Sequence, residues 1–188
     1  MDALRASWNV RKRIASPVTA VRRVEGGVEI TSLGQTERYD QVVLACHSNE
    51  ALAMLADATP AEREVLGAIR YQENDTVLHT DTRLLPKRRK AWSAWNVLIP
   101  ASPSEACTVT YCMNLLQSLD APDTFCVSLN CADRIDPAKV IQRMHYAHPE
   151  YTHASVAAQQ RKGEIQGRSG TWFAGAYWGW GFHEDGMR

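Results

Sequence analysis

The sequence predicts an α+β fold, in which a mixed and mainly antiparallel sheet carries a three-stranded β-meander and flanking helices. Early in the chain, apolar and polar residues alternate with the period of a strand on both sides of a glycine turn. Two later positions, Thr59 and Asp136, combine a helix-capping residue with a following proline. Between them lie short runs rich in β-branched and aromatic residues, separated by polar or proline-containing loops.

The first part of the chain is expected to form the meander. Residues 18–21 and 28–31 predict two strands joined by a Gly-Gly turn. A polar turn around Gly34 then leads to the continuous apolar run 42–45, which is typical of a strand buried on both faces. We expect this run to be the third strand of the meander and to enter the core.

Helix signals follow at several places. A short helix is expected over residues 50–55. Thr59, with proline next and glutamate three residues on, has the capping-box pattern of a helix that runs to about residue 69. Asp136 and its proline predict a helix through residue 144. The other expected elements are a helix at 152–160 and strands at 76–80, 91–98, 107–113, 125–131 and 171–174.

The charge balance excludes two classes of partner. Lys plus Arg and Asp plus Glu both number 21 among 188 residues, so the formal net charge is zero. A nucleic-acid or anionic-membrane binder would carry a basic excess, and we expect neither partner. No run approaches the roughly 18 apolar residues of a membrane span. The start is too charged for a secretory signal, which predicts a cytoplasmic location.

No metal site is predicted. Four of the five cysteines form two pairs of equal spacing, Cys107 with Cys112 and Cys126 with Cys131. Both pairs lie in expected strands, where an odd separation places side chains on opposite faces and prevents them from sharing one ion. His145 and His148 are closely spaced, but no carboxylate or thiol stands at ligand spacing from them.

The tail has an unusual density of glycine and aromatic residues over 170–186. Its glycines give the backbone room to approach and wrap around a flat aromatic ligand. A glycine-rich loop whose aromatics only cover a core has the same composition. Composition alone leaves these two interpretations open.

Two motifs carry a family resemblance. Residues 173–177 and 179–186 read FAGAY and GWGFHEDG, and residues 17–21 and 39–45 read PVTAV and YDQVVLA. The first motif resembles the last FAD-contacting segment of flavin amine-oxidase-like oxidoreductases, in a predicted bacterial NAD/FAD-binding subgroup. The second is similar to the meander and core strand of the same superfamily. The resemblance spans nearly the whole chain and is looser over residues 58–168.

The resemblance implies FAD as the cofactor and assigns contacts to it. Val18 would contact the adenine through its backbone, and Ala174 and Gly175 would pass the ribityl and phosphate region. Gly186 and Met187 would stand where a helix begins, with its N–H groups toward the flavin N1 and O2 edge that gathers negative charge on reduction. The remaining implied cofactor residues are Gly181, Phe182 and His183.

The substrate implied by the resemblance is a small molecule, amine-like or otherwise organic, that gives a hydride to flavin. Candidates for lining its pocket are Trp92, Trp95, Tyr111 and Trp178. Large aromatics on strands more often fill a core, so that interpretation stays open. No catalytic residue is identified.

The chain departs from the family in its dinucleotide-binding half. No G-x-G-x-x-G turn leading into a helix is present before the tail, so the Rossmann half is expected to be missing. The expected domains are 1–57, the meander and core strand of the FAD-binding part, 58–168, the substrate-binding domain, and 169–188, a truncated FAD-contacting tail. The isolated chain is accordingly expected to hold no FAD.

Two classes of function remain open from the sequence: part of an FAD-dependent oxidoreductase, or a non-catalytic module that binds a small molecule or a protein. Loss of a covering layer is expected to expose apolar side chains at Val42, Val43, Leu44, Phe173, Tyr177, Trp178 and Trp180. Because soluble monomers rarely expose large apolar patches, we expect a homo-oligomer formed through this surface, or disorder beyond about Gly170.

Overall fold

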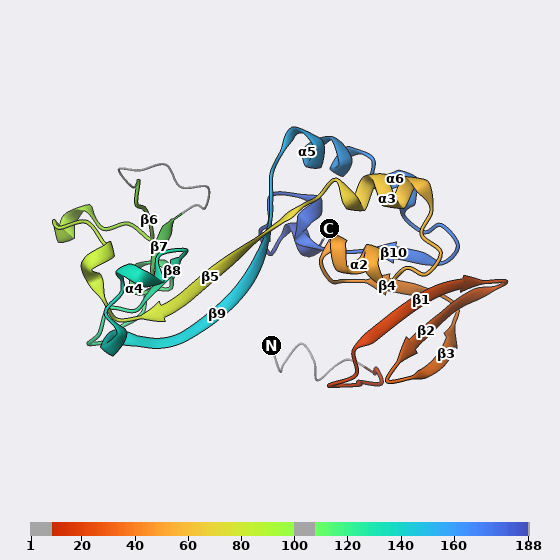
Figure 1. Ribbon diagram of the computed structural model, residues 1–188, viewed down its shortest axis with the longest axis horizontal. Coiled ribbons are helices and arrows are strands. Elements are labelled where there is room, and N and C mark those ends of the chain that lie inside the picture. Colours follow the sequence, from red (N-terminus) through yellow and green to blue (C-terminus); the bar gives the residue numbers. More distant parts are fainter. Residues whose placement is uncertain (1–8, 100–107, 188) are drawn as a thin grey trace. The chain divides into compact units, whose positions relative to one another are not determined.

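The computed structural model describes residues 9–99 and 108–187 (Figure 1). Cys107, the expected start of one strand, lies outside these residues. The chain forms two compact units, one made of Met1–Arg70 with Pro149–Arg188 and the other of Tyr71–His148. The assignment of the predicted domains to cofactor and substrate roles stays a prediction.

The meander is a three-stranded antiparallel sheet of β1 (Val18–Val24), β2 (Gly27–Ser32) and β3 (Gln35–Tyr39). Gly26 has a φ of 72°, in the left-handed region that its turn requires. The strand expected at residues 42–45 forms over Val42–Leu44, but its expected place as the third strand of the meander was wrong. Its place is taken by β3, which the sequence did not indicate because its side chains are exposed or half-buried and show no apolar alternation.

The apolar run after β3 forms a second sheet. β4 (Val42–Leu44) pairs in parallel with β10 (Thr171–Phe173) from the end of the chain. One face of this pair is buried, with Val42, Leu44, Thr171 and Phe173 on it. On the other face Val43 is 62% exposed and Trp172, directly opposite it in register, is 42% exposed.

Helices complete the first unit: α2 (Ser48–Met54), α3 (Pro60–Gly67), α5 (His153–Gln160) and α6 (Lys162–Ile165). The predicted start of α3 is confirmed. The Thr59 hydroxyl accepts from the Glu62 N–H at 3.3 Å, and the Glu62 carboxylate accepts from the Thr59 N–H at 2.8 Å. α3 contacts α2, α5 and α6, and buries Val65 and Leu66 among them.

The second unit is built on a five-stranded sheet in the order β6-β7-β8-β5-β9. The strands are β5 (Tyr71–His79), β6 (Trp95–Val97), β7 (Val109–Cys112), β8 (Cys126–Leu129) and β9 (Val140–Pro149). Pairings between β6 and β7, β7 and β8, and β5 and β8 are antiparallel, as predicted for this part of the chain. Short helical turns in the chain are η1 (Thr82–Leu84), η2 (Arg89–Ala91), α4 (Met113–Leu116), η3 (Ala132–Arg134), η4 (Pro137–Lys139), η5 (Ala176–Trp178) and η6 (Asp185–Met187).

The helix predicted through residue 144 was wrong. The Asp136 carboxylate does cap a turn, accepting from the Ala138 N–H at 3.0 Å, but that turn is the single 3-10 turn η4. The chain then continues as the ten-residue strand β9 beside β5. A capping residue and a proline fix only the first turn, and pairing with β5 decides the conformation of the residues after it.

Candidate functional site

The candidate site lies where the parallel strands β4 and β10 end. Their carboxyl ends meet at one edge of the sheet, where the Ala174 N–H donates to the Leu44 carbonyl at 3.0 Å. From this edge one chain segment passes through His47 into α2, and the other passes through Gly175 into η5. In open parallel sheets this is the edge at which ligands bind. The predicted cofactor residues Ala174 and Gly175 therefore stand at the expected edge.

The tail beyond this edge is held by side chains of the same unit. The Gln159 amide on α5 donates to the carbonyls of Tyr177 and Gly179, at 2.9 and 2.7 Å. The Trp178 indole donates to the Phe173 carbonyl at 3.1 Å. These bonds satisfy backbone carbonyls that regular structure leaves without partners, and they fix η5 against α5 and against the end of β10.

A carboxylate organises the last loop. The Asp185 carboxylate accepts from the N–H groups of Trp180 and Phe182, at 3.0 and 3.1 Å, and so closes the loop that precedes it. Phe182 and the adjoining His183 are exposed, and Met187 is exposed at the end of η6. Most of the predicted cofactor-contacting residues of this loop therefore lie at the surface.

Side chains of the chain itself fill the space beside three tail glycines. A Cβ at each would come within 2.6 Å of another side chain: Gly175 meets the Tyr177 ring, Gly179 meets the Asp185 carboxylate and Gly181 meets the Tyr151 hydroxyl. Gly181 also has a φ of 84°. These glycines are thus required by internal packing, whatever ligand the tail contacts.

The apolar surface expected from the sequence is only partly present. Val43 and Trp180 are exposed and Trp178 is half-buried. The expectation was wrong for the remaining residues, Val42, Leu44, Phe173 and Tyr177, which are buried. Alternate residues of β4 and β10 face the unit's own core, so removal of a neighbouring layer would uncover one face alone.

The other predicted cofactor residue, Val18, begins β1 and is 37% exposed. Within residues 9–99 and 108–187, no hydrogen bond joins it to the tail. Its expected contact with adenine stays a prediction.

Of the four aromatic candidates for a substrate pocket, three lie in the second unit and are divided between the two faces of its sheet. Trp95 and Tyr111 are direct partners in register and pack edge to face, with ring centroids 6.3 Å apart. Trp92 packs on the cluster that contains Cys112, which lies on the opposite face from Tyr111. Trp178 belongs to the first unit, where it packs against Tyr177. Of the four, only Trp95 and Tyr111 share one surface within the second unit.

The face of the sheet that carries Cys112 holds a buried polar row that the sequence did not indicate. His79 Nε2 is 2.8 Å from the Ser128 hydroxyl, which is 2.8 Å from the Thr110 hydroxyl. The Asp81 N–H donates to His79 Nδ1 at 3.1 Å, so in the neutral ring the proton is on Nε2 and points to Ser128. Burial lowers the pKa of His79. This histidine cannot accept the Ser128 proton, and the row holds the strands together instead of forming a nucleophile.

Three further groups near this row are held in fixed protonation states. Hydrogen bonds from the Arg83 guanidinium hold the pKa of the buried Asp81 carboxyl well below its usual range. Burial raises the pKa of Cys126 to about 12 and also raises that of Cys131. These thiols are protonated at neutral pH and lack the thiolate character of a metal ligand or nucleophile. Among the residues with described positions, no group of three or more His, Cys, Asp or Glu could hold a metal ion.

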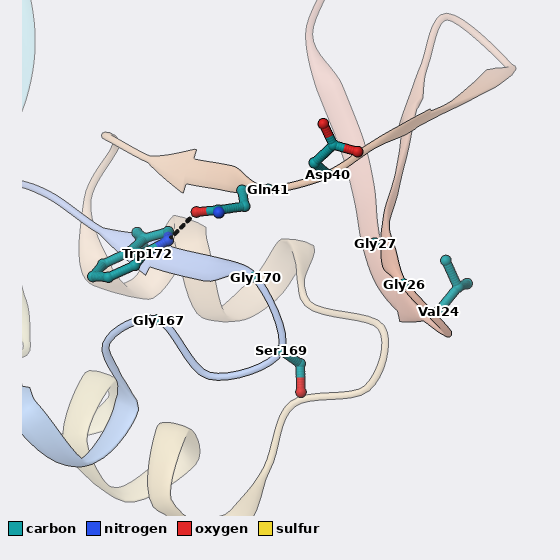
Figure 2. Close-up of a pocket in the computed structure, with 9 residues that line it drawn as sticks. All are labelled: Val24, Gly26, Gly27, Asp40, Gln41, Gly167, Ser169, Gly170 and Trp172. Atoms are coloured by element: carbon teal, nitrogen blue, oxygen red, sulfur yellow. Dashed lines mark hydrogen bonds between the residues drawn. The ribbon is translucent and has the colours of Figure 1, made fainter.

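A polar cavity of about 460 Å³ lies in the first unit, at the amino ends of β4 and β10 (Figure 2). Gly170, with a φ of 72°, passes so close to the Asp40 carbonyl that a Cβ would be 2.9 Å from it. At one side the Trp172 indole donates to the Gln41 amide oxygen at 2.7 Å. The lining consists of Val24, Gly26, Gly27, Asp40, Gln41, Gly167, Ser169, Gly170 and Trp172. The cavity lies at the opposite end of these strands from Ala174, whereas parallel sheets bind ligands at the carboxyl ends of their strands.

The fold is similar to about half of several solved structures. A CLA-producing fatty acid isomerase from P. acnes matches with a TM-score of 0.65 and 17% identity, over 98% of this chain and 48% of that one. Cyclohexylamine oxidase from Brevibacterium oxydans IH-35A matches with a TM-score of 0.51 and 16% identity, over 92% and 45% of the two chains. Putrescine oxidase bound to putrescine gives 0.52 and 12%, over 91% and 45%.

These TM-scores show a common fold, and the chain spans about half the length of the structures it matches. The sequence matches no protein-family model and no curated protein. Within the described parts of the chain, no helix has the length and apolar character needed to cross a membrane.

Proposed function

We propose that this chain is the carboxy-terminal part of an FAD-dependent oxidoreductase of the amine-oxidase-like type. The complete protein would oxidise an amine-like or other small organic substrate by hydride transfer to flavin. The observation that supports this most directly is the fold likeness to one half of two amine oxidases. The position of Ala174 and Gly175, at the carboxyl ends of a parallel strand pair, supports it independently.

The residues present suit one part of such a cofactor. Ala174 and Gly175 lie at the strand end directly beyond β10, and the exposed loop around His183 follows them in the chain. Bound FAD would supply the hydride acceptor, and the chain would supply position through the Gln159 and Asp185 hydrogen bonds that shape the tail. Nothing in the sequence provides the glycine turn and helix that receive a pyrophosphate. We therefore expect the isolated chain to purify without flavin.

A second candidate is a non-catalytic module that binds a small molecule or a protein. It is favoured by the filled spaces beside Gly175, Gly179 and Gly181, because a tail packed by its own side chains needs no ligand to fold. Under this hypothesis the glycine and aromatic density of the tail serves packing.

Flavin content separates the two. The coding sequence extended at both ends should yield a yellow protein with stoichiometric flavin, measured by its visible absorbance. In that protein Gly175→Ala should reduce flavin content, because the added methyl group displaces Tyr177 and the strand end beside it. Gly163→Ala is the matched control, since no atom lies within 4 Å of its Cβ position.

The unfolding midpoint of each variant would show whether lost flavin reflects lost folding. An extended protein that is colourless and does not bind added FAD would contradict the oxidoreductase proposal and leave the binding module.

A further inference from the structure

Two buried cysteines of the second unit lie directly opposite each other on neighbouring strands. Cys112 on β7 is the register partner of Cys126 on β8. The two residues are 1% and 0% exposed, and both belong to one apolar cluster with Leu85, so their side chains are on the same face of the sheet. Both are free thiols. The strand register therefore brings together two cysteines that lie 14 positions apart in the chain.

The backbone places this pair at a site where opposed side chains come closest. The Cys112 N–H donates to the Ala94 carbonyl at 2.9 Å, on the side away from β8. The next residue, Met113, donates its N–H to the Phe125 carbonyl at 2.9 Å. Cys112 and Cys126 are consequently a non-hydrogen-bonded pair of the antiparallel ladder, in which the two Cα atoms are about 4.5 Å apart.

The neighbouring pair on this face shows how closely such side chains approach. Thr110 and Ser128 are register partners two residues along the same strands, and their hydroxyl oxygens are 2.8 Å apart. Those oxygens occupy the γ position that sulfur occupies in cysteine. A disulfide joins Cα atoms about 4.4–6.8 Å apart. The two strands therefore need neither to separate nor to slide for a bond between Cys112 and Cys126.

The two thiols differ in their access to small molecules. A cavity of about 210 Å³ within the second unit is lined by Cys112 and Trp92 but not by Cys126. A water molecule occupies about 30 Å³ in the liquid, so the cavity has room for an oxidant slightly larger than water. Burial, with a smaller contribution from the nearby Cys112, raises the pKa of Cys126 to about 12. Oxidation would accordingly begin at Cys112 and not at Cys126.

We propose that Cys112 and Cys126 are a redox pair, which hydrogen peroxide converts into a reversible cross-strand disulfide. The Cys112 sulfur attacks one oxygen of the peroxide, the O–O bond breaks, and a sulfenic acid and one water molecule form. The Cys126 thiol then displaces the sulfenic hydroxyl, so the S–S bond forms and a second water molecule leaves. The two thiols together lose two electrons and two protons, and one peroxide is reduced to two water molecules.

The strand geometry also makes the bond reversible. A Cα separation of about 4.5 Å is near the lower limit for disulfides, which most often have about 5.5–6 Å. A disulfide held away from its preferred geometry is more easily reduced, so a dithiol should restore both thiols. The inference concerns the second unit alone and does not depend on flavin binding.

Peptide mapping tests the pair in the unaltered protein. The folded protein is exposed to hydrogen peroxide, its remaining thiols are blocked with N-ethylmaleimide in denaturant, and an unreduced digest is analysed by mass spectrometry. We expect a link between the peptides of Cys112 and Cys126 that dithiothreitol removes. The same oxidation in urea is the control: an unfolded chain has no strand register, so its links should spread over all five cysteines.

Single substitutions separate the roles of the two thiols. Cys126→Ser should leave a sulfenic acid at Cys112 that dimedone labels, whereas Cys112→Ser should leave Cys126 unlabelled. Cys131→Ser is the matched control, because Cys131 is also buried but lies outside the paired strands, and this variant should still form the link. Circular dichroism verifies folding, and Cys126→Ala, which keeps the site apolar, serves if Cys126→Ser does not fold.

Three results would overturn the proposal. The first is a peptide map of the folded protein in which other cysteines are linked, or in which Cys112 is oxidised to the sulfinic acid without a link. The second is a pair that stays reduced while the half-buried Cys46 is oxidised. The third is a link between Cys112 and Cys126 that is equally abundant in urea, because the strand register would then not be its cause.

Discussion

Replacing Arg23 by alanine should destabilise the first unit by about 3 kcal/mol. The Arg23 guanidinium extends from β1 to three groups: it forms an ion pair with Glu62 on α3, another with Asp57 at 3.1 Å, and its Nε donates to the Thr171 hydroxyl at 3.1 Å. The side chains of Arg23 and Glu62 are 10% and 2% exposed. One side chain thereby links the meander, α3 and β10.

The magnitude depends on the charge that the substitution leaves unpaired. Breaking a buried pair by removing one partner costs about 3–5 kcal/mol, because the remaining charge is buried without compensation. Glu62 keeps two hydrogen bonds, from the Thr59 N–H and hydroxyl at 2.8 and 3.0 Å, so the lower end of that range applies. For a chain of this size about 3 kcal/mol corresponds to a fall in Tm of about 6–12 °C.

Urea unfolding, followed by tryptophan fluorescence and circular dichroism, measures the effect. Arg22→Ala, on the neighbouring exposed position of β1, is the control and should change stability by less than about 0.5 kcal/mol. Equally small losses of stability for Arg23→Ala and Arg22→Ala would refute this prediction, because they would show that the Arg23 ion pair contributes no more than a surface ion pair.

Three further outcomes are expected. Gly170→Ala should destabilise the protein more than Gly34→Ala. Both glycines have a positive φ, which costs about 1–2 kcal/mol for other residues, but only the added methyl group at Gly170 would meet a backbone carbonyl. Equal shifts of the unfolding midpoint for the two variants would contradict a role for that contact. Because the pKa of Asp81 is depressed in the folded protein, its carboxylate stabilises the fold above the unfolded pKa near 4, and this contribution is lost as the pH falls toward the folded pKa. Asp81→Asn should therefore lower the stability at neutral pH and make the free energy of unfolding depend less on pH in acid. An unchanged pH dependence of unfolding in acid would contradict this. Iodoacetamide should alkylate the half-buried Cys46 before Cys126, because the Cys126 thiol is buried and its pKa is raised to about 12. Mass spectrometry identifies the modified residue, and modification of Cys126 first would refute the burial argument.

Local signals in the sequence determined the elements that depend on neighbouring residues. Thr59 and the residues after it specified the start of α3, and the helix expected at 152–160 and the hairpin of β1 and β2 likewise follow from short-range pattern. The tail motif indicated Ala174 and Gly175 as candidate cofactor contacts, and both lie directly after β10. Such features need only side chains a few residues apart, which the sequence displays directly.

Tertiary structure decided the elements whose partners are far away in the chain. β4 has the same apolar run whether it joins the meander or pairs with β10, and β9 begins with a helix cap but becomes a strand because β5 lies beside it. The contact between Arg23 and Thr171, and that between His79 and Ser128, require strand registers that no local pattern specifies. A one-residue change of register would turn these side chains to the other face. The sequence alone therefore determined turns, caps and the tail motif, and only the fold determined which faces are buried and which polar groups are paired.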